Sequence, residues 1–354
     1  MAESHASLNK INNVGDTSIT PLIRDNLVEF FDWGILDKGG FFNVGISTEG
    51  FYGGDKHKLR VVDDPNYTSG QVWEGFRSNW VWQSGLTCED QPLVIETLLE
   101  DSDYPLMKRS PGISGIYVGT SFQPTSGVGA YAYHINYPQG RVIFDTAIST
   151  SSDVKAEFSY KWVNVIPANY QFFREIQYRS QRADEDFTLV GSGDWSQLGE
   201  TRLQLPVIAV EPTVRRTQTP YSLGTSTSYV SSDVLFHVLA EDDFTRDKLV
   251  DMVSLQGDKT IFMFDSDRIG RRDDFPLDYR GMVTASGQRY PELVAASGVG
   301  GSPGTGKGYR VGAVAVTEGK FSTLRLDEAR VTTTSTLHPS LYHGVVRITT
   351  EAIL

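Results

Sequence analysis

The glycine-rich stretch GVGGSPGTGKGYRVG, residues 298–312, has the glycine and lysine spacing of a nucleotide-binding Walker A loop. A functional loop of this kind also needs a Ser or Thr after Lys307, because that hydroxyl binds Mg²⁺, and a helix whose N-terminus faces the phosphates. Here Gly308 follows the lysine, and the next residues, YRVGAVAV, alternate like a strand. We therefore predict a glycine-rich loop followed by extended backbone, and no nucleotide site.

The same stretch matches the G-x-S-x-G pattern of a hydrolase nucleophile elbow at residues 300–304. In an elbow the backbone N–H after the serine stabilises the oxyanion, but Pro303 has no N–H to donate. The 6 histidines and single cysteine stand in no motif with a supporting context. We therefore predict no catalytic residue, no cofactor-binding residue and no enzymatic activity. An active site assembled from scattered residues stays open as a further hypothesis.

Aspartates crowd the segment FDSDRIGRRDDFPLDY, residues 264–279. An EF-hand-like loop needs Asp or Asn where Ile269 stands, and interleaved arginines already supply counter-charge. We interpret the segment as a solvated, salt-bridged loop. His338 and His343 flank a proline at a spacing that favours no common metal geometry, so they predict a turn before the last strand. We predict no metal site. The aspartates are Asp265, Asp267, Asp273, Asp274 and Asp278.

The densest aromatic cluster lies in QVWEGFRSNWVWQSG, residues 71–85. If NWVWQ is extended, two of its tryptophans share a face and form either a stacking platform for a sugar ring or a large apolar area. We favour burial in the core or at a subunit interface, because aromatic residues are enriched in interface cores. The glycan platform remains the alternative. The candidate interface or stacking residues are Trp73, Phe76, Trp80 and Trp82.

The composition predicts a folded protein with little affinity for nucleic acid. The chain has 354 residues, and 32 Lys+Arg against 44 Asp+Glu give a formal net charge of −12. Such an acidic surface does not cling to DNA phosphates, although passing, non-specific contact stays possible. Cys88 is the only cysteine, which excludes an intramolecular disulfide. The sequence has no signal-like start and no apolar run long enough to span a membrane, so we predict synthesis in the cytoplasm and no membrane partner.

One helix and many strands are expected. The stretch TPLIRDNLVEFFDWGILDKGG, residues 20–40, has Thr20 as a candidate N-cap, Pro21 at the first helical position and a terminal Gly-Gly pair. The following residues predict strands at 130–137, 141–145 and 154–166. The last third predicts a strand in SDVLFHVLAE, a helix in DDFTRDKLVDMVSLQ, a strand in KTIFMFD, a hairpin in residues 309–326 and a final strand in GVVRITTEAI.

These elements predict an α+β, predominantly β fold. We expect an N-terminal arm and helix in residues 1–40, a β-rich domain, sandwich or barrel-like, in residues 41–215, and a smaller α+β domain in residues 216–354. The boundary is placed in the polar segment EPTVRRTQTPYSLGTSTS, residues 211–228.

Three passages carry a resemblance to structural proteins of tailed-bacteriophage virions. They are LIRDNLVEFFDWGILDKGGFFNV, YPQGRVIFDTAISTSSDVKAEFSYKWVNV and HVLAEDDFTRDKLVDMVSLQGDKTIFMFD. Their style is similar to that of head-to-tail neck, connector and tail-completion proteins.

The resemblance implies a non-enzymatic virion component that forms a ring homo-oligomer at the neck between capsid and tail. Its partners would be copies of itself and portal, connector or tail proteins, and an acidic lumen would let packaged DNA pass. The main alternative is a carbohydrate-binding module on a tail or baseplate, which depends on the tryptophan platform.

Overall fold

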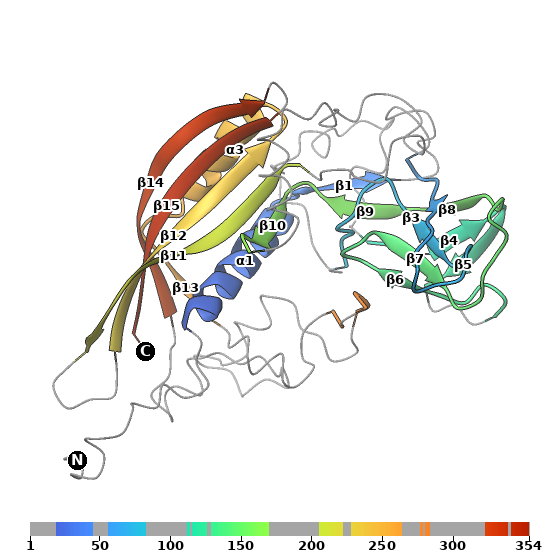
Figure 1. Cartoon of the computed structure of the whole chain (residues 1–354), viewed down its shortest axis with the longest axis horizontal. Coiled ribbons are helices and arrows are strands. Elements are labelled where there is room, and N and C mark those ends of the chain that lie inside the picture. The colour runs from blue at the N-terminus through green and yellow to red at the C-terminus, as the bar shows by residue number, and fades with distance from the viewer. Residues whose placement is uncertain are drawn as a thin grey trace, which may run out of the picture.

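The computed structural model shows a predominantly β protein with an N-terminal helix (Figure 1). The strands in the described residues form four sheets, of which one is much larger than the others. The structure describes residues 19–44, 56–82, 112–113, 115–125, 129–169, 205–221, 228–263, 277–278, 280–283, 323–338 and 341–353.

Three of the sheets are small, antiparallel and built from residues 41–161. They pack around one hydrophobic core, which contains Trp73, Trp80, Phe144 and Phe158. We call this group the small sheets. The first pairs β1 (Phe41–Val44) with β9 (Phe158–Lys161), the second has the order β2 (Arg60–Val61), β3 (Val72–Glu74), β7 (Arg141–Phe144), β6 (Tyr133–Asn136), and the third has the order β5 (Ser121–Pro124), β4 (Gly115–Val118), β8 (Val154–Ala156).

The fourth sheet, which we call the large sheet, has six strands in the order β10-β11-β12-β15-β14-β13. β10 pairs with β11 in parallel, and every other neighbouring pair is antiparallel. Figure 1 shows it as a strongly curved layer beside the small sheets. The strands are β10 (Asn164–Pro167), β11 (Val207–Pro220), β12 (Ser228–Ala240), β13 (Lys259–Phe262), β14 (Thr323–His338) and β15 (Leu341–Ile353).

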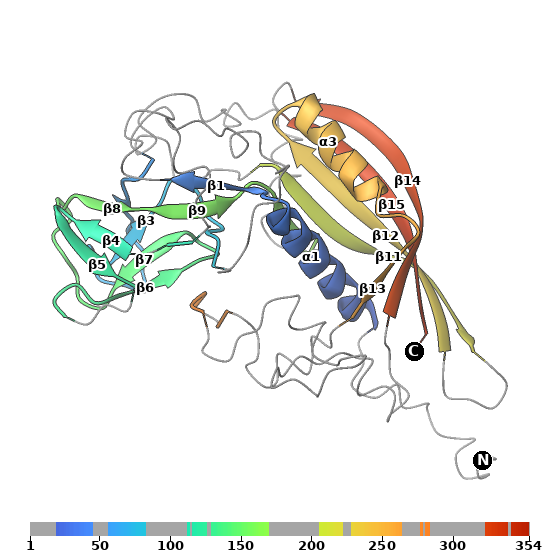
Figure 2. The ribbon, with the colours of Figure 1, turned by 180° about the vertical axis from the view of Figure 1, so that it is seen from behind.

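Both described helices, α1 (Ile19–Asp37) and α3 (Asp243–Ser254), lie on the same face of the large sheet (Figure 2). Alternate residues of β12, such as Val234 and Phe236, point to this face and are fully buried, as the period of two in a strand requires. The phenyl ring of Phe31 in α1 packs edge-on against that of Phe236, with centroids 5.0 Å apart. Burial of this face holds the helices on the sheet.

The helix ends follow local sequence signals. α1 ends in a Schellman motif, because Gly40 N–H donates to Ile35 O and Gly39 N–H donates to Leu36 O, both at 2.9 Å. Gly39 has a φ of 79°, which a residue without Cβ adopts most easily. α3 begins after Asp242, whose carboxylate accepts a hydrogen bond from Thr245 N–H at 2.7 Å. Such a cap stabilises a helix by about 1 kcal/mol.

The small sheets are formed by residues between α1 and β10. The chain therefore leaves the large sheet and its helices after α1 and returns to them at β10. At this junction Lys161 Nζ lies 2.6 Å from Asp32 Oδ2, and both side chains are mostly buried. Trp162 N–H donates to Gly40 O at 2.9 Å. An ion pair and a backbone bond therefore tie β9 to the end of α1.

Several sequence predictions are confirmed and two patterns differ. The helix near residues 20–40, the strands at 130–137 and 141–145, the helix α3 and the final strand are all present. The stretch 154–166 is divided among β8, β9 and β10, because successive parts pair with different strands. The predicted boundary near residue 215 falls inside β11, and residues on both sides of it pair with β12. Most of the predicted hairpin, like the Walker-like stretch, lies outside the described residues.

Candidate functional site

The structure places the predicted aromatic residues mostly in the core of the small sheets. Trp73, Phe76 and Trp80 have exposed fractions of 2%, 3% and 1%. Trp82 is half-buried at the edge of the described segment. The backbone at Trp80 forms only a single bridge, to Tyr160, rather than a continuous strand. An open platform shared by Trp80 and Trp82, the alternative to burial, is therefore not formed.

The two buried indoles have their polar atoms satisfied inside the protein. Trp73 Nε1–H donates to Gly70 O at 3.0 Å, and Trp80 Nε1–H donates to Arg77 O at 2.8 Å. The Trp80 ring stacks on Phe158 with centroids 4.3 Å apart and an interplanar angle of 20°. Since the rings and their donors are engaged internally, they offer no face to a sugar or to another subunit.

Of the predicted aspartate cluster, the structure describes Asp278 alone. Its carboxylate accepts hydrogen bonds from Arg280 N–H at 2.8 Å and Met282 N–H at 3.0 Å, and it forms an ion pair with Arg280 at 3.2 Å. Burial by itself raises the pKa of Asp278, but these hydrogen bonds and the arginine outweigh it, so the pKa is lowered. This part of the segment is a salt-bridged turn.

The large sheet brings His343 next to a histidine that the sequence pattern did not single out. His237 Nδ1 and His343 Nε2 lie 3.2 Å apart, and the rings are stacked with centroids 5.5 Å apart. His237 Nε2 lies 2.8 Å from Glu211 Oε2. The three residues come from β15, β12 and β11, and they lie on the sheet face opposite the helices. Their separations in sequence left no local signal of this contact.

The His343 ring is neutral at physiological pH. Burial, and then the charge of His237, lower the pKa of His343 to about 4. The His343 ring can therefore take up a proton only in acid. Within the described part of the chain, no group of three His, Cys, Asp or Glu side chains is arranged to hold a metal ion.

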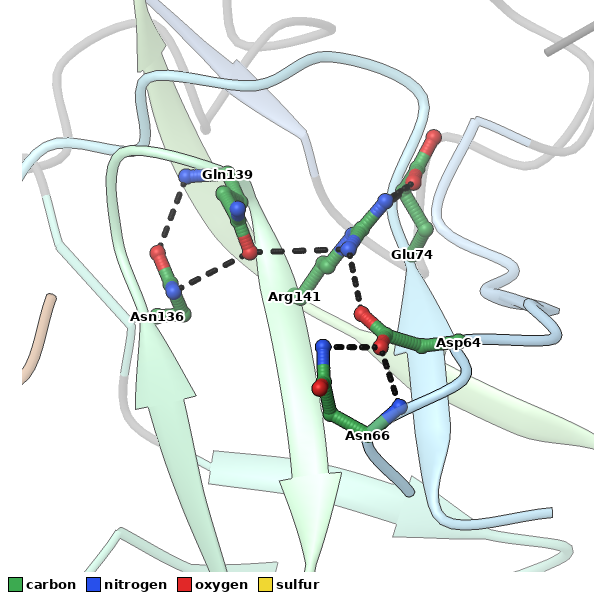
Figure 3. A network of polar contacts seen from close by, with 6 residues as sticks. All are labelled: Asp64, Asn66, Glu74, Asn136, Gln139 and Arg141. Carbon is green, nitrogen blue, oxygen red and sulfur yellow. Dashed lines mark hydrogen bonds and ion pairs between the residues drawn. The ribbon is translucent and has the colours of Figure 1, made fainter. Parts of the chain in front are cut away.

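A polar network crosses one of the small sheets (Figure 3). Glu74 in β3 accepts from Arg60 at 3.2 Å and from Arg141 at 3.1 Å, and Arg141 also reaches Asp64 Oδ2 at 3.4 Å. Asp64 in turn accepts from Asn66 N–H at 2.9 Å. Two cations and two carboxylates balance each other in this network. The network links β2, β3 and β7 through charge-assisted hydrogen bonds. Each of its charges already has a partner, so we interpret it as a structural network that holds these strands together.

The face of the large sheet opposite the helices has a buried apolar cluster at one end, which includes Val207, Leu239 and Leu341, and charged side chains farther along the strands. Asp233 in β12 accepts from Arg347 Nη2 at 2.5 Å and from Thr349 Oγ1 at 3.1 Å, both in β15. Arg330 in β14 lies opposite Arg347 in the pairing register and forms its own ion pair with Glu328 at 2.6 Å. The Asp233–Arg347 ion pair therefore links β12 to β15 on a sheet face that no described helix covers, while Arg330 is compensated by Glu328 within β14.

Two long strands of the large sheet have most of one edge unpaired among the described residues. β10 pairs only with Val207–Val210 of β11, and β13 pairs only with Thr323–Leu326 of β14. We call the remaining parts the β11 open edge, residues 211–220, and the β14 open edge, residues 327–338. A single backbone bond, from Asp258 N–H to Asp327 O, reaches the second of them.

Both open edges are solvent-exposed along most of their length. Residues 215–220 of the first and residues 331–334, 336 and 337 of the second are exposed. The β14 open edge has the sequence DEARVTTTSTLH, which is rich in β-branched residues and has no charge after Arg330. Such a strand favours extended backbone and leaves N–H and C=O groups available to another strand.

Comparison with known proteins adds no relative: no family model matches the chain, and no curated protein matches it. Neither described helix is long and apolar enough to cross a membrane. The fold and its surface features therefore define a predominantly β protein whose most distinctive exposed features are the two open edges.

Proposed function

We propose that the protein is a non-enzymatic structural component of a tailed-phage virion, and that it acts as a homo-oligomer at the neck between capsid and tail. The virion location and the neck position follow from the resemblance of the sequence. The assembly role follows from the surface of the large sheet.

The observation that carries this proposal is the β14 open edge, since the β11 open edge contains Pro212 and Pro220. An exposed strand edge is a ready template for pairing with another chain, and proteins that stay monomeric usually blunt their edges with lysine, proline or a covering loop. The β14 open edge contains neither lysine nor proline, and Val331 and Leu337 are 49% and 42% exposed. Association through this edge would satisfy its backbone groups and bury its apolar side chains.

Two further features support a structural role near DNA. The formal net charge of −12 keeps DNA from adhering while it passes. In this proposal the large sheet contacts like copies, and portal, connector or tail proteins are the further partners. The carbohydrate-binding alternative needs the Trp80 ring at the surface, whereas that ring is 1% exposed.

The proposal is tested in two steps. Light scattering over a concentration series and negative-stain electron microscopy of the purified protein are expected to show an oligomer with rotational symmetry. Mass spectrometry of purified phage particles, with immunogold labelling, is expected to find the chain in the virion at the junction of head and tail. A protein that stays monomeric at the highest concentration reached, or that is missing from intact particles, contradicts the proposal.

A further inference from the structure

We infer that copies of the chain join head to tail, with the β14 open edge of one copy paired antiparallel with the β11 open edge of the next. This inference rests on the proposed function and names the contact through which the oligomer forms. The partner is a second copy of this chain, and the large sheet continues from one copy into the next.

The position of the short edge strands selects the direction of pairing. β10 covers β11 at residues 207–210, directly before the β11 open edge, and β13 covers β14 at residues 323–326, directly before the β14 open edge. In a parallel pairing of the two open edges, β10 of one copy and β13 of the other would occupy the same place. In an antiparallel pairing β10 lies beyond His338 and β13 lies beyond Pro220, so both strands fit.

The two open edges also lie at opposite ends of the large sheet. Pro220, the last residue of β11, pairs with Ser228 of β12, and the next residue of β12, Tyr229, pairs with Ile353 of β15. The β11 open edge therefore reaches the end of the sheet at which β15 ends. The β14 open edge reaches the other end, where Thr336 pairs with Tyr342. Each copy can therefore use both edges at once without either contact blocking the other. Such a heterologous contact closes into a ring when the rotation between copies is right.

Charge favours this pairing over the pairing of two β11 edges about a twofold axis. The β11 open edge carries one glutamate and the arginines Arg215 and Arg216, and the β14 open edge with its start carries Asp327, Glu328 and Arg330. The first therefore has one net positive charge and the second one net negative charge. Two β11 edges paired antiparallel would place Arg215 of one copy opposite Arg216 of the other, and like charges at opposite positions destabilise a strand pair.

The pairing is tested by crosslinking between copies. In a Cys88→Ser background, Thr217→Cys places a thiol on the β11 open edge and Thr333→Cys places one on the β14 open edge, both at exposed positions. A bismaleimide crosslinker tolerates a shift of one or two residues, because neighbouring residues of a strand are about 3.3 Å apart. Each single-cysteine variant is treated alone and in an equimolar mixture after reassembly.

The inference predicts crosslinked dimers in the mixture of Thr217→Cys and Thr333→Cys, and only background from either variant alone. The control mixture replaces Thr333→Cys with Thr120→Cys, at an exposed turn of the small sheets, and is expected to give background. Efficient crosslinking of Thr333→Cys with itself would overturn the head-to-tail contact in favour of a twofold one. An oligomer in light scattering without any crosslink in the mixture also overturns the inference while leaving the proposed function intact, whereas a monomer overturns both.

A second test removes the edge without a reagent. The double variant Thr334→Lys, Thr336→Lys places two charges on the β14 open edge and is expected to raise the concentration needed for assembly by at least about tenfold. The matched control is Thr120→Lys. Circular dichroism melting checks that both variants fold. Assembly of the double variant at the wild-type concentration would overturn the inference.

Discussion

Replacement of Trp80 by alanine tests how the aromatic cluster is used. The indole is 1% exposed, stacks on Phe158 at 4.3 Å between centroids and donates its N–H to Arg77 O at 2.8 Å. If this packing holds, Trp80→Ala acts on the stability of the small sheets and not on the binding of a ligand.

The magnitude follows from how tightly the ring is enclosed. Truncation of a buried tryptophan costs about 3–5 kcal/mol, and the cost rises when the cavity cannot collapse. A Cβ added at Gly75 would lie 2.5 Å from Trp80 Cζ2, and one added at Gly140 would lie 2.9 Å from Nε1, so backbone closes on the ring at both places. Loss of the donor to Arg77 O adds roughly 1 kcal/mol. We therefore expect the upper part of this range, about 4–5 kcal/mol.

The assay is urea unfolding, monitored by far-UV circular dichroism and by the fluorescence of the remaining tryptophans. Since total stabilities are about 5–15 kcal/mol, such a loss shifts the unfolding midpoint strongly. The large sheet has a separate hydrophobic core, so a transition assigned to it is expected to change less. Trp82→Ala, at a half-buried position, serves as the control and is expected to cost less than half as much.

A Trp80→Ala variant whose free energy of unfolding lies within about 0.5 kcal/mol of the wild type, the usual range of surface substitutions, would contradict the buried position of the ring. The ring would then be accessible, and a glycan array with the same variant would become the next measurement. A large stability loss combined with unchanged binding in such an array supports the core position.

Three further outcomes follow from single positions. Burial, and then the charge of Asp32, raise the pKa of Glu29 to about 7. The folded state therefore binds more protons than the unfolded state from about pH 4.5 to 7, and the free energy of unfolding falls as the pH rises through this range. In urea unfolding, Glu29→Gln is expected to be more stable than the wild type at about pH 8 and equally stable near pH 4. The pKa of His343 is lowered from 6.5 to about 4, so between these pH values the unfolded state binds more protons than the folded state. The free energy of unfolding therefore falls as the pH falls from about 6.5 to 4, and His343→Gln is expected to flatten this part of the pH profile. A Cβ at Gly344 would lie 2.5 Å from Val250 Cγ2, so Gly344→Val is expected to push α3 away from β15 and to cost about 1–3 kcal/mol in thermal unfolding.

Local sequence signals predicted the helices and several strands because these signals act over a few residues. Asp242 caps α3 through the N–H three residues later, and Gly39 ends α1 in the left-handed conformation. The alternation of β12 shows which residues face the core, since a strand repeats every two residues. The period of two also appears in residues 154–166. This pattern does not predict where the chain changes from one partner strand to another.

The candidate sites depended on contacts that no local pattern encodes. His237 and His343 are 106 positions apart and meet only because β12 and β15 are neighbours. The tryptophan spacing was compatible with a platform or a core, and only the packing of Phe158 on Trp80 decided between them. The β14 open edge has strong strand propensity in sequence, yet its openness depends on how short β13 is and where it pairs.

The sequence by itself determined the predominantly β character, the N-terminal helix, the acidic surface and the absence of a disulfide, because composition, capping and periodicity are properties of the chain and its near neighbours. Tertiary structure alone decided the strand order, the burial of Trp80 and the position of the open edges. These features depend on which distant segments pair. The free energy that favours one pairing over another comes from contacts throughout the core, and no single position in the sequence carries it.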